Sequence, residues 1–145
     1  MLEDPDLKIS ILSLWVIGRQ FPDANDYWDG NWLNVRAEAR TSGAIVEVAG
    51  PIVHLSELVS FVNELEALDS VLSGKALLCG SLEPNLRLEL RGNGTGGIAG
   101  TLAITPDHMV QSHEFVLDCD QTYLKPLIAG CKKVLMDYPI KGRIA

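Results

Sequence analysis

The side chains best suited to acid–base or metal chemistry are the three histidines and the nineteen carboxylates. None of His54, His108 and His113 lies in a His-Glu-x-x-His pattern or beside a cysteine pair with zinc-ligand spacing. The sequence also has no Gly-x-Ser-x-Gly motif around a nucleophilic serine. We therefore predict no catalytic residue and no metal site, and we do not expect an enzyme.

One alternative stays open, since acidic residues are numerous enough for some to lie close to a histidine. His113 begins a predicted strand that ends near Asp118 and Asp120, and His108 lies just before it. If these side chains converged in a pocket, clustered carboxylates with His108 or His113 would indicate an enzyme or a small-ligand-binding protein.

The stretch from Gly92 to Gly97 matches Gly-x-Gly-x-x-Gly, the dinucleotide-binding pattern. That pattern binds pyrophosphate only where a helix follows, because the helix amino terminus holds the phosphates. The next residues, from Ile98 to Ile104, have the composition of a strand. This stretch is therefore predicted to be a hairpin loop, and no cofactor is expected.

The segment from Asp26 to Trp32 is the most distinctive part of the chain. Two of the three tryptophans and one of the three tyrosines lie within it, beside two aspartates and a glycine. Large amphipathic rings suit binding surfaces, and Asp, Gly and Asn favour a tight turn. We interpret it as a recognition turn in which Trp32 points inward at the start of a strand while Tyr27 or Trp28 points outward. Packing of these rings against one end of a sheet is the structural alternative.

The elements that would carry this turn follow from hydrophobic periodicity. Strands are predicted at 8–17, 32–40, 44–49, 75–82, 86–91, 98–105 and 112–119, with Gly50-Pro51 ending the third. Apolar residues at steps of three and four predict helices at 55–72 and 122–137, with Pro126 in the first turn of the second. The order predicts a single α+β domain over residues 1–145, with an antiparallel sheet of about six to seven strands and two amphipathic helices packed on one face.

Composition limits the classes of function. A net charge of −7 disfavours nucleic-acid binding, which needs a basic surface, and is compatible with a basic protein partner. The apolar runs are all shorter than the ~18 residues of a membrane span, and the acidic start Met1–Asp6 differs from a secretion signal. A cytoplasmic protein without membrane association is expected. Its three cysteines, Cys79, Cys119 and Cys131, are predicted to be reduced thiols.

The ordered motifs of the chain resemble the WapI-type immunity proteins over roughly residues 8–139. The resemblance rests on Phe21-Pro22-Asp23 followed by Asp26–Leu33, on Leu82-Glu83-Pro84, on the glycine-rich loop before Ile98, and on Asp120–Leu124. It implies a bacterial, cytoplasmic, non-catalytic protein that binds and neutralises a cognate toxin domain of a contact-dependent competition system. It also implies that the toxin is a nuclease, whose identity does not carry over. The implied mechanism is stoichiometric occlusion of the toxin.

The partner-binding residues expected from this resemblance are Asp23, Asp26, Tyr27, Trp28 and Asp29. A row of mixed charge on exposed strand faces is an alternative surface, formed by Arg36, Glu38, Arg87, Glu89 and Arg91. A homodimer is also open, because an edge strand such as Lys8–Ile17 can pair with its copy across a two-fold axis.

Overall fold

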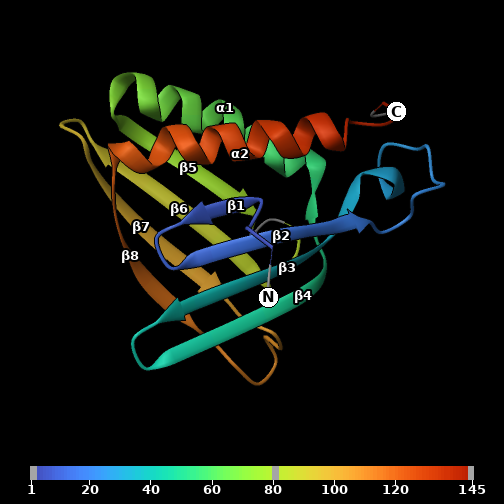
Figure 1. Ribbon diagram of the computed structural model, residues 1–145, viewed down its shortest axis with the longest axis horizontal. Coiled ribbons are helices and arrows are strands. Elements are labelled where there is room, and N and C mark those ends of the chain that lie inside the picture. The colour runs from blue at the N-terminus through green and yellow to red at the C-terminus, as the bar shows by residue number, and fades with distance from the viewer. Residues whose placement is uncertain (1–2, 80–81, 144–145) are drawn as a thin grey trace.

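The computed structural model describes residues 3–79 and 82–143 of the chain. Its elements are two α-helices, two short 3₁₀ helices and eight strands, which confirms the α+β class (Figure 1). The strands are β1 (Leu7–Ile9), β2 (Leu12–Arg19), β3 (Trp32–Thr41), β4 (Ala44–His54), β5 (Ser73–Cys79), β6 (Leu86–Asn93), β7 (Gly97–Ile104) and β8 (Glu114–Asp120). The helices are α1 (Leu55–Val71) and α2 (Leu124–Asp137), and the 3₁₀ helices are η1 (Asp29–Asn31) and η2 (Gln121–Tyr123).

The strands form two antiparallel sheets of four strands each, β1-β2-β3-β4 and β5-β6-β7-β8. The expectation of one sheet with six to seven strands was therefore wrong. Alternation of apolar and polar residues shows which face of a strand is buried, but it does not show which strands pair. Here α1 follows β4 directly and carries the chain away from the first sheet before β5 begins, so the second four strands pair only among themselves.

The predicted first strand, 8–17, is a hairpin in the structure. β1 and β2 pair through Leu7 with Leu14 and Ile9 with Leu12, and Ser10 in the turn has the left-handed φ of 52°. β2 also pairs with β3, so Lys8–Ile17 is not a single edge strand. The hairpin was not predicted for two reasons. Strand-forming residues continue through the turn, and Ser10-Ile11 lacks the Gly or Asn that usually marks such a turn.

Gly50-Pro51 does not end the third predicted strand, because β4 runs on to His54. The pairing with β3 shifts register between Leu33 and Asn34, opposite Val53 and Pro51. β4 is the last strand of its sheet, and a proline, which lacks an N–H group, is tolerated on an edge strand or at a bulge. The longer β4 therefore ends at His54, and α1 begins at the next residue, Leu55.

The second sheet has the predicted order of an antiparallel meander, and residues 94–96 join β6 to β7 as a hairpin loop. No helix follows that loop, so the dinucleotide pattern lacks the helix it needs. The predicted strand 75–82 is observed as β5, which ends at Cys79. Residues 80–81 of the prediction lie outside the described part of the chain.

One hydrophobic core is shared by both sheets and both helices. It contains residues such as Leu33 and Val35 of β3, Leu88 of β6, Phe61 of α1 and Cys131 of α2. Figure 1 shows α1 and α2 side by side across the same end of the two sheets. Pro126 lies in the first turn of α2, as predicted. Burial raises the pKa of the Cys131 thiol to about 12, so this cysteine behaves as a small apolar core residue.

Among the described residues, no helix is long and apolar enough to cross a membrane.

Candidate functional site

The aromatic turn, residues 26–32, is built around a single aspartate. The Asp26 carboxylate accepts a hydrogen bond from the Asp29 N–H at 2.8 Å, and its carbonyl accepts one from the Gly30 N–H at 3.0 Å. These bonds close the chain into η1 and satisfy the N–H groups at its start, as expected of an Asx-type turn. The turn then passes into β3 at Trp32, whose backbone is extended.

Asn31 fixes the turn to the carboxyl-terminal residues 139–142, here called the tail. Its side chain is fully buried, and its amide N–H groups donate to the Tyr27 carbonyl at 2.7 Å and the Lys141 carbonyl at 2.9 Å. Its amide oxygen accepts from the Lys141 N–H at 2.9 Å. Figure 1 shows the segment after α2 running toward the loop that joins β2 to β3. Asn31, near the end of the turn, is therefore paired with Lys141 of the tail.

Three residues make further contacts that tighten this attachment. The Lys141 ammonium donates to the carbonyls of Pro22 and Ala24 at 2.8 and 3.0 Å. Arg19 donates to the Gly30 carbonyl at 2.6 Å and also bonds the Pro139 carbonyl. Gly142 has a φ of +67°, and a Cβ there would lie 2.6 Å from the Tyr27 nitrogen, so only glycine fits this close approach. The turn is thus held from both sides as a rigid element.

His54 lies beneath the aromatic rings and is fully buried. The Trp28 ring stacks on it with centroids 5.0 Å apart, the Trp32 ring meets it edge-on at 5.0 Å, and Tyr27 is tilted against it at 5.6 Å. Such arrangements of rings add roughly 0.5–1.5 kcal/mol per pair beyond the area they bury. His54 therefore serves as the floor on which the recognition turn rests.

The hydrogen bonds of His54 define its tautomer. Nε2 lies 3.1 Å from the Trp28 carbonyl, which can only accept, so Nε2 carries the proton. Nδ1 then accepts from the Ser56 N–H at 3.2 Å and from the Ser56 hydroxyl at 2.7 Å. His54 is also the N-cap of α1, and the Glu57 carboxylate accepts from its N–H at 3.3 Å, which completes a capping box. The imidazole thus joins the aromatic turn to the first turn of α1.

The five residues predicted to bind a partner lie together on this turn and the loop before it. Asp23, Asp26, Trp28 and Asp29 are exposed, with 52% of Trp28 accessible, while Tyr27 is half-buried against His54. Trp32 is buried, with 8% of its surface accessible, as predicted for the first residue of a strand. The rings of Trp28 and Trp32 meet edge-on at 5.6 Å. The structure therefore presents one tryptophan to solvent and supports it with another.

Sequence reasoning missed His54, Asn31 and the tail. The His54-x-x-Glu57 spacing is that of a capping box, but His replaces the usual Ser or Thr, so it gave only a weak signal. The pairing of Asn31 with Lys141 leaves no local pattern at all, because 110 positions separate the two residues.

The alternative surface of mixed charge is divided between the two sheets. Arg36 and Glu38 lie on β3, whereas Arg87, Glu89 and Arg91 lie on β6. Each glutamate is already paired with arginines two positions away, and the Arg91 and Arg40 guanidinium groups lower the pKa of Glu89 and Glu38 respectively. Because these charged side chains are already paired within their own strand, they would add little binding energy with a partner.

The structure does not bring His113 together with the carboxylates near the end of β8. His108 is exposed, and His113 precedes β8, with its Nε2 3.1 Å from the Gln111 side chain. Asp118 lies five residues further along the extended chain, a separation of about 16 Å. In the part of the chain that the structure describes, no group of three or more His, Cys, Asp or Glu side chains is arranged to hold a metal ion.

Comparison with known proteins gives a family but no individual relative. No curated protein and no solved structure matches the chain. The model of the immunity protein WapI-like family matches residues 2–139, which include the aromatic turn, both sheets and both helices. The chain therefore belongs to the WapI-like family of immunity proteins.

Proposed function

We propose that this protein binds a cognate toxin domain and neutralises it by occlusion, one molecule to one toxin, without catalysing a reaction. The observation that carries the proposal is Trp28, half exposed on a turn whose backbone is fixed by Asn31, Arg19 and the tail. A large ring held in one position loses little conformational freedom on binding, and such rings supply most of the energy of protein interfaces.

The charge around Trp28 indicates the character of the partner. Asp23, Asp26 and Asp29 are exposed on the same turn and the loop before it, and the whole chain carries a net charge of −7. A basic protein would be steered to this surface, and enzymes that act on nucleic acids are commonly basic because their substrates are polyanions. We infer that the toxin is a nuclease and that neutralisation takes place in the cytoplasm, before the toxin reaches its substrate.

The direct test uses the gene that neighbours this one upstream. Its carboxyl-terminal toxin domain is expressed from an inducible promoter in a sensitive strain, with and without this protein. Growth should be restored only when the protein is present, and the two purified proteins should form a 1:1 complex. Failure of the wild-type protein to protect against that toxin domain would refute the proposal.

The site is tested separately with matched variants. Trp28→Ala should raise the Kd for the toxin by at least about 30-fold, the usual effect of removing an aromatic anchor from the centre of an interface. Tyr123→Ala removes another exposed ring, 39% accessible, from a surface next to α2, and should leave the Kd unchanged. If both variants bind like the wild type, the toxin binds elsewhere on the molecule.

Light scattering on the same samples tests whether the protein forms a homodimer. A monomer at high concentration would agree with toxin binding by single molecules. A stable dimer would require the aromatic turn to stay exposed in the assembly.

A further inference from the structure

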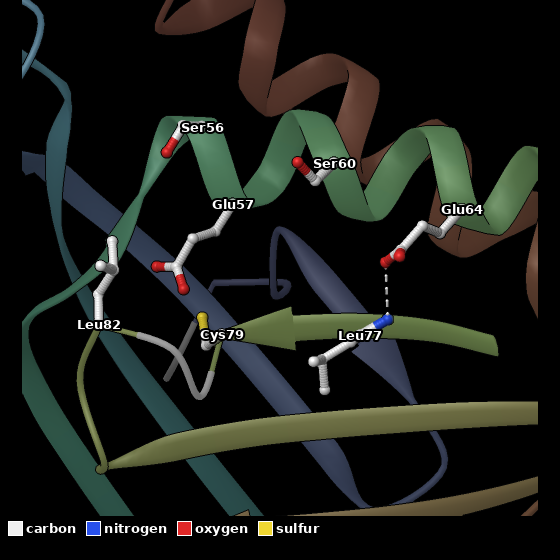
Figure 2. A pocket seen from close by; sticks show the side chains of 7 residues that line it. All are labelled: Ser56, Glu57, Ser60, Glu64, Leu77, Cys79 and Leu82. Atoms are coloured by element: carbon white, nitrogen blue, oxygen red, sulfur yellow. Dashed lines mark hydrogen bonds between the residues drawn. The ribbon is translucent and has the colours of Figure 1, made fainter.

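A groove lies between α1 and β5, next to the aromatic turn. It has a volume of about 370 Å³, and its walls are formed by Ser56, Glu57, Ser60, Glu64, Leu77 and Cys79. Figure 2 shows Glu57 and Glu64 projecting from α1 toward β5, with Ser56 and Ser60 on the same helix and Leu82 at one end. Ser56 belongs both to this groove and to the bonds that hold His54 beneath Trp28, so the groove adjoins the proposed toxin-binding surface.

One polar atom in the groove has no partner among the described residues. Glu57 Oε1 accepts from the His54 N–H, whereas Oε2 is buried and unbonded. Figure 2 shows the carboxylate aimed into the groove toward Cys79. Burial raises the pKa of Glu57, and the nearby Glu83 carboxylate raises it further. A buried acceptor without a donor is costly, and most such groups in proteins are satisfied by a ligand, an ion or water.

The rest of the lining also offers acceptors. The Ser56 hydroxyl donates its proton to His54 Nδ1, so its oxygen is free to accept. Glu64 Oε1 accepts from the Leu77 N–H at 3.0 Å, and this bond joins α1 to the edge strand β5. None of the described residues that line the groove is a lysine or an arginine. Two carboxylates are therefore present without a cation between them.

We propose that this groove receives an arginine side chain of the toxin, with its guanidinium group bonded to Glu57 Oε2. The proposal rests on the proposed function and assigns a second contact to the same interface. Guanidinium is planar, always charged and carries five N–H donors, so it can serve the glutamate and the serine oxygens together. Leu82 is 40% exposed at the end of the groove and offers an apolar surface for the methylene stem.

The first test needs no toxin. n-Butylguanidinium is titrated into the full-length protein and followed by ¹⁵N–¹H NMR, with n-butanol as the uncharged control. A Kd on the order of 10 mM is expected for a ligand of this size, with shifts confined to the amides of the groove. The Glu57 carboxyl should also become easier to ionise in the presence of the probe. Absence of localised shifts, or equal shifts with n-butanol, would overturn the proposal.

Two variants identify the acceptor. Glu57→Gln keeps an oxygen for the His54 N–H, because Gln also serves in capping boxes, but it removes the charge. Glu66→Gln makes the same change on the same helix at a residue that pairs with Lys132, outside the groove. Probe shifts should disappear in Glu57→Gln and persist in Glu66→Gln. Persistence in both variants would contradict the assignment to Glu57.

The second test uses the toxin domain. Loss of one partner from a buried charge pair at an interface lowers affinity by about 30-fold or more, so Glu57→Gln should weaken the complex by that factor while Glu66→Gln does not. If the wild type protects cells and Glu57→Gln binds equally well, the groove is not part of the interface. If the wild type fails to protect cells, the proposed function is wrong, and so is the proposal that the groove binds an arginine of the toxin. The butylguanidinium titration still decides whether the groove binds the cation.

Discussion

At the scale of single residues, Trp28 and Trp32 stand four positions apart and perform different tasks. Trp32 is buried at the head of β3, whereas Trp28 lies half exposed on His54. Trp32→Ala should lower the free energy of unfolding by about 3–5 kcal/mol, because it leaves a cavity in the core. Trp28→Ala should lower it by only about 1 kcal/mol, since it mainly loses ring stacking. Urea unfolding measures both, and equal losses would contradict the division of roles.

Glu57 gives a pH dependence of stability that can be isolated. Its pKa is raised from about 4.5, mainly by burial, so the folded chain binds the proton more tightly than the unfolded chain. Its favourable contribution is therefore fully present below about pH 4.5 and is lost as the pH rises through the raised pKa. Glu57→Gln avoids burying the charge and should be more stable than the wild type at neutral pH, by less than about 1 kcal/mol because solvent screens part of the carboxylate.

That advantage should disappear at about pH 4, where Glu57 is protonated in both states. Glu38 and Glu89 shift in the opposite direction, because arginine neighbours lower the pKa of each. Protonation of Glu38 and Glu89 therefore destabilises the fold at low pH, but equally in the wild type and in Glu57→Gln. The difference in unfolding free energy between these two proteins, measured in urea, therefore reports Glu57 alone. If the stability advantage of Glu57→Gln grew as the pH fell, the raised pKa of Glu57 would be contradicted.

Residue-level prediction succeeded where the cause was local. Inward-pointing Trp32 follows from its place at the start of an alternating strand, and exposure of the aspartates follows from charge. The unbonded oxygen of Glu57 could not be predicted, because it depends on how closely β5 approaches α1. His54 was treated only as a poor candidate for metal binding, and its packing under three rings depends on the register between β3 and β4.

At the scale of elements, the aromatic turn depends on the tail. Asn31→Ala removes four side-chain bonds and leaves part-buried backbone groups of Tyr27 and Lys141 without these partners. The expected cost is about 1–3 kcal/mol in unfolding free energy, together with faster hydrogen exchange at the Asp29 and Gly30 amides. Asn34→Ala is the control, because Asn34 lies on β3 and makes none of these bonds. Unchanged exchange in Asn31→Ala would show that the turn holds its shape without the tail.

The elements were predictable to different degrees for physical reasons. The helices and the second meander agree closely with their periodicity, because amphipathic spacing is a local property. The hairpin at Ser10 and the continuation of β4 through Pro51 were not predicted, since both depend on tertiary pairing. Division into two sheets also lies beyond local pattern, because strand partners are chosen by the whole fold.

At the scale of the whole molecule, both sheets and both helices share one core, and a single domain stays our prediction. Unfolding should then be a single cooperative transition. The three tryptophans, at positions 15, 28 and 32, all belong to the first sheet and its turn, whereas far-ultraviolet circular dichroism reports both sheets. The two signals should give the same midpoint in urea. Separate midpoints would mean that the sheets are independent units.

The bond between Asn31 and Lys141 also sets an order in time. A ribosome adding about 5–20 residues per second makes the aromatic turn long before it makes Lys141, 110 positions later. The turn therefore waits for roughly 5–20 s before its anchor exists. A nascent chain would contain every residue of the proposed surface and yet lack the rigid form that binds tightly. If the proposed function holds, a newly synthesised copy would begin to bind its toxin only after the tail has left the ribosome.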